Sequence, residues 1–496
     1  MFNTNLLEIK TLGELKKAGY QTRTIKEEVR QNLIEKLQKK EELFSGIYGY
    51  EKTVVPELQN ALLSKHNIIL LGLRGQAKTR IARLLIHLLD EFIPIIEHSE
   101  VNDNPFHPIS RFAKDLIAEK GDATPISWVH KSERYGEKLA TPDVTVADLV
   151  GDIDPIKAAT LKLAYSDERI LHYGIIPRTN RGIFVINELP DLQPRIQVSL
   201  FNILQEQDIQ IRGFKTRIPM DILLIFTANP EDYTNRGSII TPLKDRIDSQ
   251  IITHYPKTLE IARKITEQES FKATERSVKI HVPELIKDLI EQIGFEARES
   301  EFVDHKSGVS ARLSISAYEN LLSQVERRAI VNGENETSVR IVDLYRLIPS
   351  ITGKVELVYE GEQEGMQKVA IAFINKAIRS HFKEFFADPG KFKGSEENNP
   401  YKEIISWFNK KNILDLDLDE ATADYEFKLS KVTGLNTLAQ SKLKLFGDAN
   451  IPLIEEFILD ALSLYSLIGK ETLEESITYK NMMGSMFKNL KFEEEE

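Results

Sequence analysis

Cysteine is absent from the 496-residue sequence. Disulfide bonds, thiolate nucleophiles and cysteine-ligated zinc are therefore excluded, and the composition suits a reducing compartment. Long apolar runs are absent too, because charged residues interrupt each apolar segment before the roughly 18 residues that a transmembrane helix needs. The first residues, MFNTNLLEIK, lack the basic and then apolar pattern of a signal peptide. We expect a cytoplasmic protein with no membrane segment.

An excess of positive charge is also lacking, since the net charge is −11. Nucleic acid and anionic membranes therefore exert no global attraction, although a local basic patch remains compatible with this value. Apolar residues make up 41% of the chain and charged residues 28%, as in ordinary globular proteins. The length exceeds that of one compact core, so the chain is expected to fold into roughly two to four domains.

The spacing of apolar residues divides the chain into segments. Residues 1–45 are predicted to hold an amphipathic helix that packs on the next domain, because Thr24 and Glu27 form a capping box before a helical pattern. Residues 46–256 alternate short apolar runs with helical stretches, which is typical of a parallel sheet with helices on both faces. The runs are Ile68–Leu71, Ile183–Ile186, Ile222–Phe226 and Ile251–Thr253.

The remainder of the chain is predicted to be helical. Residues 257–355 form a helical domain, and residues 356–496 form a further, mostly helical domain of unknown role. Near its end, Pro452 suits the first turn of an amphipathic helix that we expect to stop at Gly469. The predicted fold class is α/β with additional helical N- and C-terminal regions.

A phosphate-binding loop, or P-loop, follows the first apolar strand. It reads Gly72-Leu73-Arg74-Gly75-Gln76-Ala77-Lys78-Thr79, which matches the relaxed pattern G-x-x-x-x-[AG]-K-[ST] and leads into an apolar helix. Backbone N–H groups and the helix N-terminus of such a loop bind phosphates, with Lys78 against the β- and γ-phosphates and the Thr79 hydroxyl on Mg²⁺. Alanine tolerates only ordinary backbone dihedrals, so we expect that position 77 does not require a positive φ.

The apolar strand Ile183–Ile186 ends in Asn187 and Glu188. Enzymes with a P-loop place an acidic pair at such a point, to hold Mg²⁺ and to polarise the attacking water. Asn187 lacks the charge of the usual aspartate, but its amide can hydrogen-bond to a metal-bound water. Glu188 is the candidate for polarising the water. Taken alone, a buried strand that ends in a surface turn explains this segment equally well.

The order of these motifs resembles the AAA+ ATPases, in particular the group of the magnesium-chelatase ATPase subunit and MoxR. The resemblance covers about residues 45–355, and residues 97–138 are longer than the family pattern. Its most specific stretches are Leu149-Val150-Gly151-Asp152-Ile153-Asp154-Pro155, Gly174-Ile175-Ile176-Pro177 and Asn180-Arg181-Gly182. In this group the intervening segment is the helix-2 insert, a hairpin that faces the pore of a ring. The fold implied is a P-loop AAA+ domain with a helical lid.

The resemblance also implies roles for residues outside the P-loop. Tyr48 and Gly49 would line the adenine pocket, and Asn229, in T-A-N-P, would be sensor 1. Arg246, in L-K-D-R-I, would be the arginine finger that stabilises charge on the γ-phosphate of a neighbouring subunit. Arg312, in G-V-S-A-R, would be sensor 2 of the lid.

The predicted site thus has three groups of residues. The catalytic residues are Glu188, Asn229, Arg246 and Arg312, and the metal residues are Thr79 and Asn187. The nucleotide-binding residues are Tyr48, Gly49, Gly72, Leu73, Arg74, Gly75, Gln76, Ala77, Lys78, Thr79 and Arg80. The cofactors implied are ATP and Mg²⁺, bound between subunits of a homo-oligomeric ring, a hexamer.

The function implied by the resemblance is ATP hydrolysis coupled to work on a partner. The first hypothesis is a chaperone-like remodeller, or a motor that loads metal or a cofactor into a protein client, with a separate metal-adhesion-domain adaptor. The alternative is a nucleic-acid motor, because a hairpin predicted at residues 209–218 carries Arg212, Lys215 and Arg217. A third hypothesis is a nucleotide-gated scaffold in which Asn187 has silenced turnover.

Overall fold

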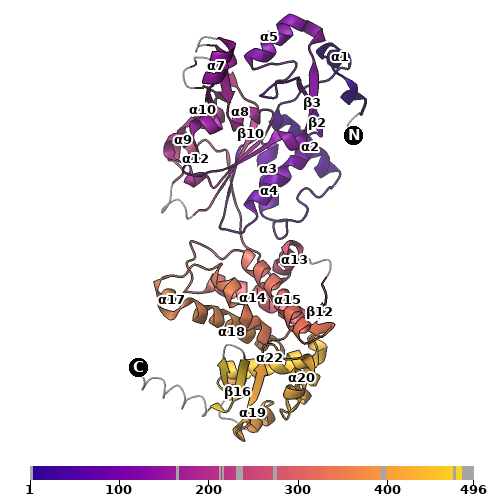
Figure 1. Cartoon of the computed structure of the whole chain (residues 1–496), viewed down its shortest axis with the longest axis vertical. Coiled ribbons are helices and arrows are strands. Elements are labelled where there is room, and N and C mark those ends of the chain that lie inside the picture. Colours follow the sequence, from indigo (N-terminus) through magenta and orange to yellow (C-terminus); the bar gives the residue numbers. More distant parts are fainter. Residues whose placement is uncertain are drawn as a thin grey trace. The chain divides into compact units, whose positions relative to one another are not determined.

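The computed structural model of the chain describes residues 4–162, 167–211, 214, 217–230, 238–271, 276–392, 398–472 and 476–482. The chain divides into two compact units, Met1–Tyr255 and Pro256–Glu496, drawn in indigo to magenta and in orange to yellow in Figure 1. None of the helices in the described ranges combines the length and apolar character needed to cross a membrane.

The first unit is built on a five-stranded parallel sheet, which confirms the predicted fold class. The strands, in spatial order, are β11 (Ser249–Ile252), β1 (Ile68–Leu71), β10 (Ile222–Ala228), β7 (Gly182–Asn187) and β4 (Tyr135–Leu139). Each neighbouring pair is parallel. Because parallel strands place their carboxyl ends at one edge, the segments that follow β1, β7 and β10 meet there.

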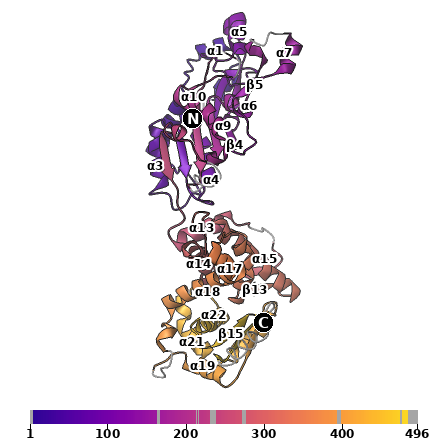
Figure 2. The ribbon, with the colours of Figure 1, turned by 90° about the vertical axis from the view of Figure 1, so that its left-hand side faces the viewer.

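The sheet separates two hydrophobic cores, because successive side chains of a strand point to opposite faces. In β1, Ile68 and Leu70 join one core, whereas Ile69 and Leu71 join the other. Helices cover both faces (Figure 1, Figure 2). The first core is covered by α2 (Ile25–Gln38), α3 (Val54–Leu63) and α4 (Lys78–Leu84), and the second by α6 (Val146–Leu149), α8 (Ile175–Arg178), α9 (Pro194–Ser199) and α10 (Phe201–Gln205).

The N-terminal segment packs on this unit. Thr24 and Glu27 form the capping box that starts α2, and Val29 is buried in the core beneath it. Ahead of α2, α1 (Leu12–Lys17) lies on the long segment 97–138, and the Trp128 indole N–H donates to the carbonyl oxygen of Ile9 at 3.1 Å. This segment contains α5 (Arg111–Lys120) and β3 (Ile126–His130), and β3 pairs antiparallel with β2 (Phe92–Ile96), which precedes the segment. The extra residues therefore form a platform for the N-terminus.

A buried ion pair fastens α2 to the sheet. Both Nη atoms of Arg134 donate to the carboxylate of Glu28, at 2.8 and 2.7 Å. Arg134 Nε donates to the carbonyl oxygen of Arg181, and Arg181 Nη1 donates to that of Pro94 at 2.7 Å. Arg181 belongs to the predicted stretch Asn180-Arg181-Gly182, so the arginine of that motif has a structural position between β2 and β7.

The second unit has one hydrophobic core, shared by the segments 257–355 and 356–496. Its longer helices are α13 (Leu259–Glu269), α14 (Glu284–Glu299), α15 (Arg312–Val331), α18 (Met366–Phe385) and α22 (Ile451–Leu464). α18 packs against both α14 and α22, and α14 packs against α15. The helices of the segment 257–355, including α15 with Arg312, and the C-terminal helices therefore form one body.

The C-terminal segment also contains a small sheet that the sequence pattern does not predict. Its order is β14 (Leu414–Asp417), β16 (Ser476–Lys480) and β15 (Gly469–Thr472), all antiparallel. The expectation that Gly469 ends a helix is wrong, because α22 already ends at Leu464 and Gly469 begins β15. α22 is not amphipathic in its surroundings either, since Glu456 and Asp460 are fully buried.

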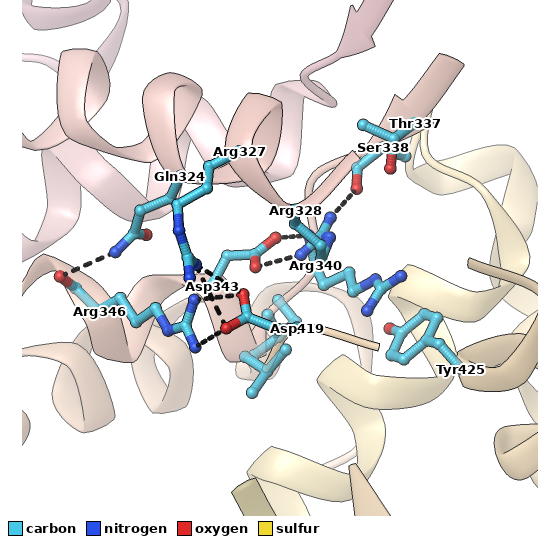
Figure 3. Close-up of polar contacts among 12 residues, drawn as sticks. Gln324, Arg327, Arg328, Thr337, Ser338, Arg340, Asp343, Arg346, Asp419 and Tyr425 are labelled. Carbon is cyan, nitrogen blue, oxygen red and sulfur yellow. Dashed lines mark hydrogen bonds and ion pairs between the residues drawn. The ribbon is translucent and has the colours of Figure 1, made fainter. Parts of the chain in front are cut away.

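Ion pairs join α15 to the C-terminal segment within this unit (Figure 3). Asp419, which follows β14, accepts hydrogen bonds from both Nη atoms of Arg346 at 2.7 and 2.9 Å and from Arg327 at 3.1 Å. Within the segment 257–355 itself, Arg328 of α15 forms a buried pair with Asp343. Polar as well as apolar contacts therefore hold the two halves of the second unit together.

Candidate functional site

The loop between β1 and α4 lies at the carboxyl edge of the first sheet. Gly75 and Ala77 have φ values of 75° and 57°, in the left-handed region that glycine favours. The expectation that position 77 does without a positive φ is wrong. The turn into α4 forces this alanine into the left-handed conformation, at a cost of about 1 kcal/mol for a residue with a Cβ atom. Backbone strain of this kind clusters at functional sites.

Side chains from two other segments support the loop. Tyr50 Oη donates to the carbonyl oxygens of Gln76 and His254, at 3.0 and 2.7 Å. Thr253 Oγ1 donates to Gln76 Oε1 at 2.8 Å, and Tyr255 Oη donates to the carbonyl oxygen of Arg74 at 2.9 Å. Burial raises the pKa of Tyr50 to about 12, so its hydroxyl stays a donor at neutral pH. The P-loop is therefore held in shape by residues after β11 and before α3.

The predicted adenine segment lies beside this support. Tyr48 and Gly49 are partly buried, and Gly49 has a φ of 82°. The sequence pattern singles out these two residues but not Tyr50, whose contact with the P-loop crosses 26 positions of the chain. An aromatic residue with a polar tip, placed directly after a glycine turn, is the signal that could have identified it.

Lys78 begins α4 and is buried. Its ammonium donates to the carbonyl oxygens of Gly72 and Leu73, the latter at 3.1 Å. Phosphate oxygens in the loop would be stronger, charged acceptors for the same group. Of the other predicted loop residues, Gln76 is buried, Leu73, Thr79 and Arg80 are partly buried, and Arg74 and Gly75 are exposed.

The structure brings Thr79 together with the ends of β7 and β10. Thr79 Oγ1 donates to Asn187 Oδ1 at 3.4 Å, and Thr227 Oγ1 donates to the same oxygen at 3.1 Å. The backbone N–H of Glu188 donates to Thr227 Oγ1 at 3.1 Å. Glu188 has a φ of 54°, a second strained position at this edge, and Asn229 is buried just beyond β10.

A carboxylate outside the predicted site borders this network. Glu137, on β4, accepts a hydrogen bond from Asn187 Nδ2 at 2.7 Å. It also accepts from Arg83 Nε and Nη2, at 2.9 and 3.0 Å, and from Tyr135 Oη at 3.1 Å. The Arg83 guanidinium holds the pKa of Glu137 below its usual range. β4 has no apolar run, so neither the strand nor its glutamate stands out in the sequence.

Two predicted catalytic arginines lie apart from the P-loop in the chain. Arg246 follows α12 (Thr241–Lys244); it donates to the carbonyl oxygen of Pro242 at 2.7 Å and to Gln205 Oε1 at 3.1 Å. Its guanidinium also lies 4.8 Å from the centre of the Phe201 ring. Arg312 begins α15 in the second unit, where its backbone N–H donates to Ser310 Oγ at 3.1 Å. Their roles as arginine finger and sensor 2 stay predictions.

A hairpin is present where the helix-2 insert is predicted. β5 (Gly151–Ile153) and β6 (Leu171–Tyr173) pair antiparallel, and α7 (Pro155–Leu161) lies between them in sequence. A Cβ atom on Gly174 would lie 2.5 Å from the carbonyl carbon of Leu149, and one on Gly151 would lie 2.3 Å from the carbonyl oxygen of His172. These two glycines of the motif therefore allow backbone segments to meet at the base of the hairpin.

The second predicted hairpin is partly described. β8 (Asp208–Ile209) and β9 (Ile218–Pro219) pair antiparallel. Arg212 and Lys215, two of its three basic residues, lie outside the described residues. The third, Arg217, pairs with Asp208 at 3.4 Å, which offsets its charge.

Known proteins resemble this chain in sequence. Residues 160–252, which include β7, β10 and β11, match the family described as the Sigma-54 interaction domain. The magnesium-chelatase 67 kDa subunit of Heliobacterium mobile is 26% identical over 202 residues, which is 40% of this chain and 29% of that protein. A magnesium-chelatase subunit ChlI homolog of Methanocaldococcus jannaschii is 26% identical over 228 residues, which is 45% of this chain and 59% of that protein. The chain thus spans less than two thirds of either relative.

Solved structures resemble the chain more remotely. An ATPase from Cytophaga hutchinsonii has 16% identity and a TM-score of 0.29, over 73% of this chain and 98% of that chain. A complex of the magnesium-chelatase subunits BchI and BchD has 18% identity and a TM-score of 0.34, over 65% of this chain and 98% of that chain. At such TM-scores these likenesses carry no argument about the site.

Proposed function

We propose that this chain, which is related to the magnesium-chelatase subunits, is an AAA+ ATPase that binds and hydrolyses Mg-ATP at the carboxyl edge of its first sheet. The observation that carries the proposal is the hydrogen-bonded series from Thr79 through Asn187 and Thr227 to Glu188. It joins the P-loop helix to the ends of two strands, where a nucleotide-hydrolysing site needs a metal residue and a water-polarising residue.

The residues at this edge fit a magnesium nucleotide. Mg²⁺ takes oxygen ligands and retains several waters, and the Thr79 hydroxyl and Asn187 amide oxygen supply two neighbouring oxygens. When bound, Mg²⁺ neutralises charge on the β- and γ-phosphates. Lys78 exchanges loop carbonyls for phosphate oxygens, Glu188 accepts the proton of the attacking water, and Asn229 orients that water.

In the proposed assembly the chain forms a homo-oligomeric ring, a hexamer, with ATP between subunits. Arg312 has the role of sensor 2, and Arg246 contacts the ATP of the neighbouring subunit. The contacts of Arg246 with Pro242, Gln205 and Phe201 support its role as arginine finger, because they hold the guanidinium on α10 and α12. A cation held there can be offered to the phosphates of an adjoining copy.

The proposed outcome of hydrolysis is remodelling of a protein client, or loading of metal or a cofactor into it. The net charge of −11 and the pairing of Arg217 with Asp208 support a protein client over nucleic acid, since affinity for nucleic acid depends on basic groups that contact phosphates. The helix-2 insert and the hairpin at residues 209–218 would contact the client in the pore.

Binding and turnover of ATP by the purified full chain test the proposal. Lys78→Ala is expected to lose binding of a fluorescent ATP analogue. Glu188→Gln is expected to keep binding and to lose turnover by roughly 10²–10⁴-fold, because the general base is gone. Glu119→Gln, on the exposed part of α5, is the matched control. Native protein that fails to bind ATP, or a Glu188→Gln variant with native turnover, would contradict the proposal.

The class of client can be read from what the Glu188→Gln variant retains with ATP. The variant is captured from native lysate, half of the sample is treated with nuclease, and Lys78→Ala provides the background. Protein that stays bound after nuclease treatment supports the remodeller. Captured nucleic acid, or partners lost on nuclease treatment, would favour the nucleic-acid motor instead.

A further inference from the structure

The metal edge of the proposed site contains an amide where a carboxylate is usual. An aspartate at the end of this strand normally helps to hold Mg²⁺ in P-loop enzymes. Asn187 supplies an oxygen of similar shape but no negative charge, although Mg²⁺ favours charged oxygen ligands. The charge must therefore come from elsewhere if the site is to retain the usual affinity for magnesium.

Glu137 provides a carboxylate one strand away. β4 and β7 are parallel with Glu137 opposite Val185, so the side chains of residues 137, 185 and 187 point to the same face. Val185 belongs to the core on the α4 side of the sheet. On α4, Thr79 and Arg83 are one turn apart and share a side, and they contact Asn187 and Glu137 respectively.

The hydrogen bonds determine which way the Asn187 amide faces. An ionised carboxylate only accepts, so Nδ2 faces Glu137, and Oδ1 faces the hydroxyls of Thr79 and Thr227. A carboxylate that accepts from a metal ligand makes that ligand a stronger electron donor, as with metal-bound histidine. Glu137 therefore increases the negative charge on the oxygen that faces the P-loop.

Glu137 is held firmly in this position. Arg83 binds both of its carboxylate oxygens, and Tyr135 donates to one of them. The Arg83 side chain is 64% exposed and that of Glu137 22% exposed. Water therefore screens the arginine more strongly than the glutamate, so the ion pair orients the carboxylate and offsets only part of its charge at Asn187.

We propose that Glu137 is the charged group of the magnesium site, acting as a positioning residue through Asn187. The carboxylate of the site thus lies on β4, next to the usual position at the end of β7. This inference rests on the proposed binding of Mg-ATP, and it adds a residue that neither the P-loop pattern nor the family resemblance identifies.

The test measures how binding of a fluorescent ATP analogue depends on Mg²⁺, with EDTA as the magnesium-free reference. Glu137→Gln is expected to raise the Mg²⁺ concentration that gives half of the full increase in analogue affinity by about 10–100-fold. Loss of a group that hydrogen-bonds to a metal ligand weakens metal binding by such a factor. The affinity for the ATP analogue in EDTA is expected to stay unchanged, because the contacts of the P-loop with the phosphates are intact. Glu133→Gln, at an exposed position of η4 (Lys131–Arg134), is the matched control, and thermal melting checks folding.

A double-mutant cycle separates this role from a structural one. Asn187→Asp is expected to restore the native magnesium dependence in the Glu137→Gln background, because it returns the charge to the end of β7. In the native background the gain is expected to be smaller, because Glu137 already supplies the negative charge and adjacent carboxylates repel one another.

An unchanged magnesium dependence of analogue binding in Glu137→Gln would overturn the inference. So would an equal increase in magnesium affinity from Asn187→Asp in the native and Glu137→Gln backgrounds. Equal weakening of binding with Mg²⁺ and with EDTA would do the same, because it indicates damage to the loop. Failure of the native protein to bind ATP at any Mg²⁺ concentration would contradict the proposed function instead.

Discussion

Buried polar groups have different surroundings in the two units. In the second unit Asp460 accepts hydrogen bonds from the hydroxyls of Tyr345 and Tyr479 and pairs with Lys470, and all four residues lie in regular helices or strands. In the first unit the pair Arg134–Glu28 is a buried structural contact of the same kind. A second group of polar side chains lies where strands end, around a loop with strained backbone at Ala77 and Glu188. Burial of charge alone therefore does not indicate a site.

The difference lies in what the polar groups are arranged around. The network of the second unit closes on itself and ties β15, β16 and α22 into one core. Groups at the sheet edge of the first unit converge on backbone N–H groups and a helix N-terminus, which are suited to bind an anion. Substitutions in each region should therefore have different effects.

The largest expected effect on stability is at Asp460. Asp460→Ala leaves the ammonium of Lys470 buried without its partner, so the free energy of unfolding of the second unit is expected to fall by about 3–5 kcal/mol. Asp419→Ala is the control, because its pairs with Arg346 and Arg327 are partly exposed and contribute about 1 kcal/mol or less. Urea denaturation of both variants measures the difference. Equal losses would show that the two networks do not differ as proposed.

The pH dependence of stability should differ between the units. Burial raises the pKa of Glu456 to about 7, above the value of about 4.3 in an unfolded chain. The folded unit therefore binds more protons in this window, and the free energy of unfolding falls as pH rises from about 4 to 7 and then levels off. Glu456→Gln is expected to remove this slope, which denaturation at several pH values would detect.

Asp221 gives the comparison in the first unit. Burial raises the pKa of Asp221 to about 6. The free energy of unfolding of the first unit should therefore also fall as pH rises, but the fall should end near pH 6, below the value for Glu456. Asp221→Asn should remove it. A free energy of unfolding that rises with pH between about 4 and 7 in both units would contradict the raised pKa values of Glu456 and Asp221.

The smallest expected effect is at Ala77. Ala77→Gly removes a Cβ atom from a left-handed position and is expected to stabilise the first unit by up to about 1 kcal/mol. Ala82→Gly, in the regular part of α4, should destabilise it by about 0.5–1 kcal/mol because glycine weakens a helix interior. Melting temperatures of the two variants should therefore move in opposite directions. A downward shift in both would show that position 77 carries no strain.

Much of the first unit follows from local sequence. β1, β7, β10 and β11 are short apolar runs bounded by turn residues, and such runs are typical of buried parallel strands. β4 is missed because its sequence, YGEKL, has no such run and becomes a strand by pairing with β7. Glu137 is missed with it, since its contact with Asn187 joins residues 50 positions apart.

Two further predictions from the sequence, for Ala77 and for the C-terminal elements, fail for the same physical reason. Ala77 adopts a positive φ because the P-loop turn overrides the preference of an isolated alanine. In the second unit, α22 and the strands β14 to β16 carry polar residues such as Asp460, whose burial depends on partners distant in sequence. Local patterns predict elements that stabilise themselves, and they fail where tertiary contacts decide the conformation.

Mixed subunits test the central claim most directly, namely that each Mg-ATP site is built from two copies of the chain. Lys78→Ala lacks a working P-loop, and Arg246→Ala lacks the arginine finger, a loss of about 10³–10⁵-fold in turnover. Each variant alone is expected to be nearly inactive. Mixed in equal amounts, roughly a quarter of the ring interfaces should join an intact Lys78 to an intact Arg246, and ATPase activity should return. Activity that stays absent at every mixing ratio, or a fully active Arg246→Ala variant, would contradict the shared site.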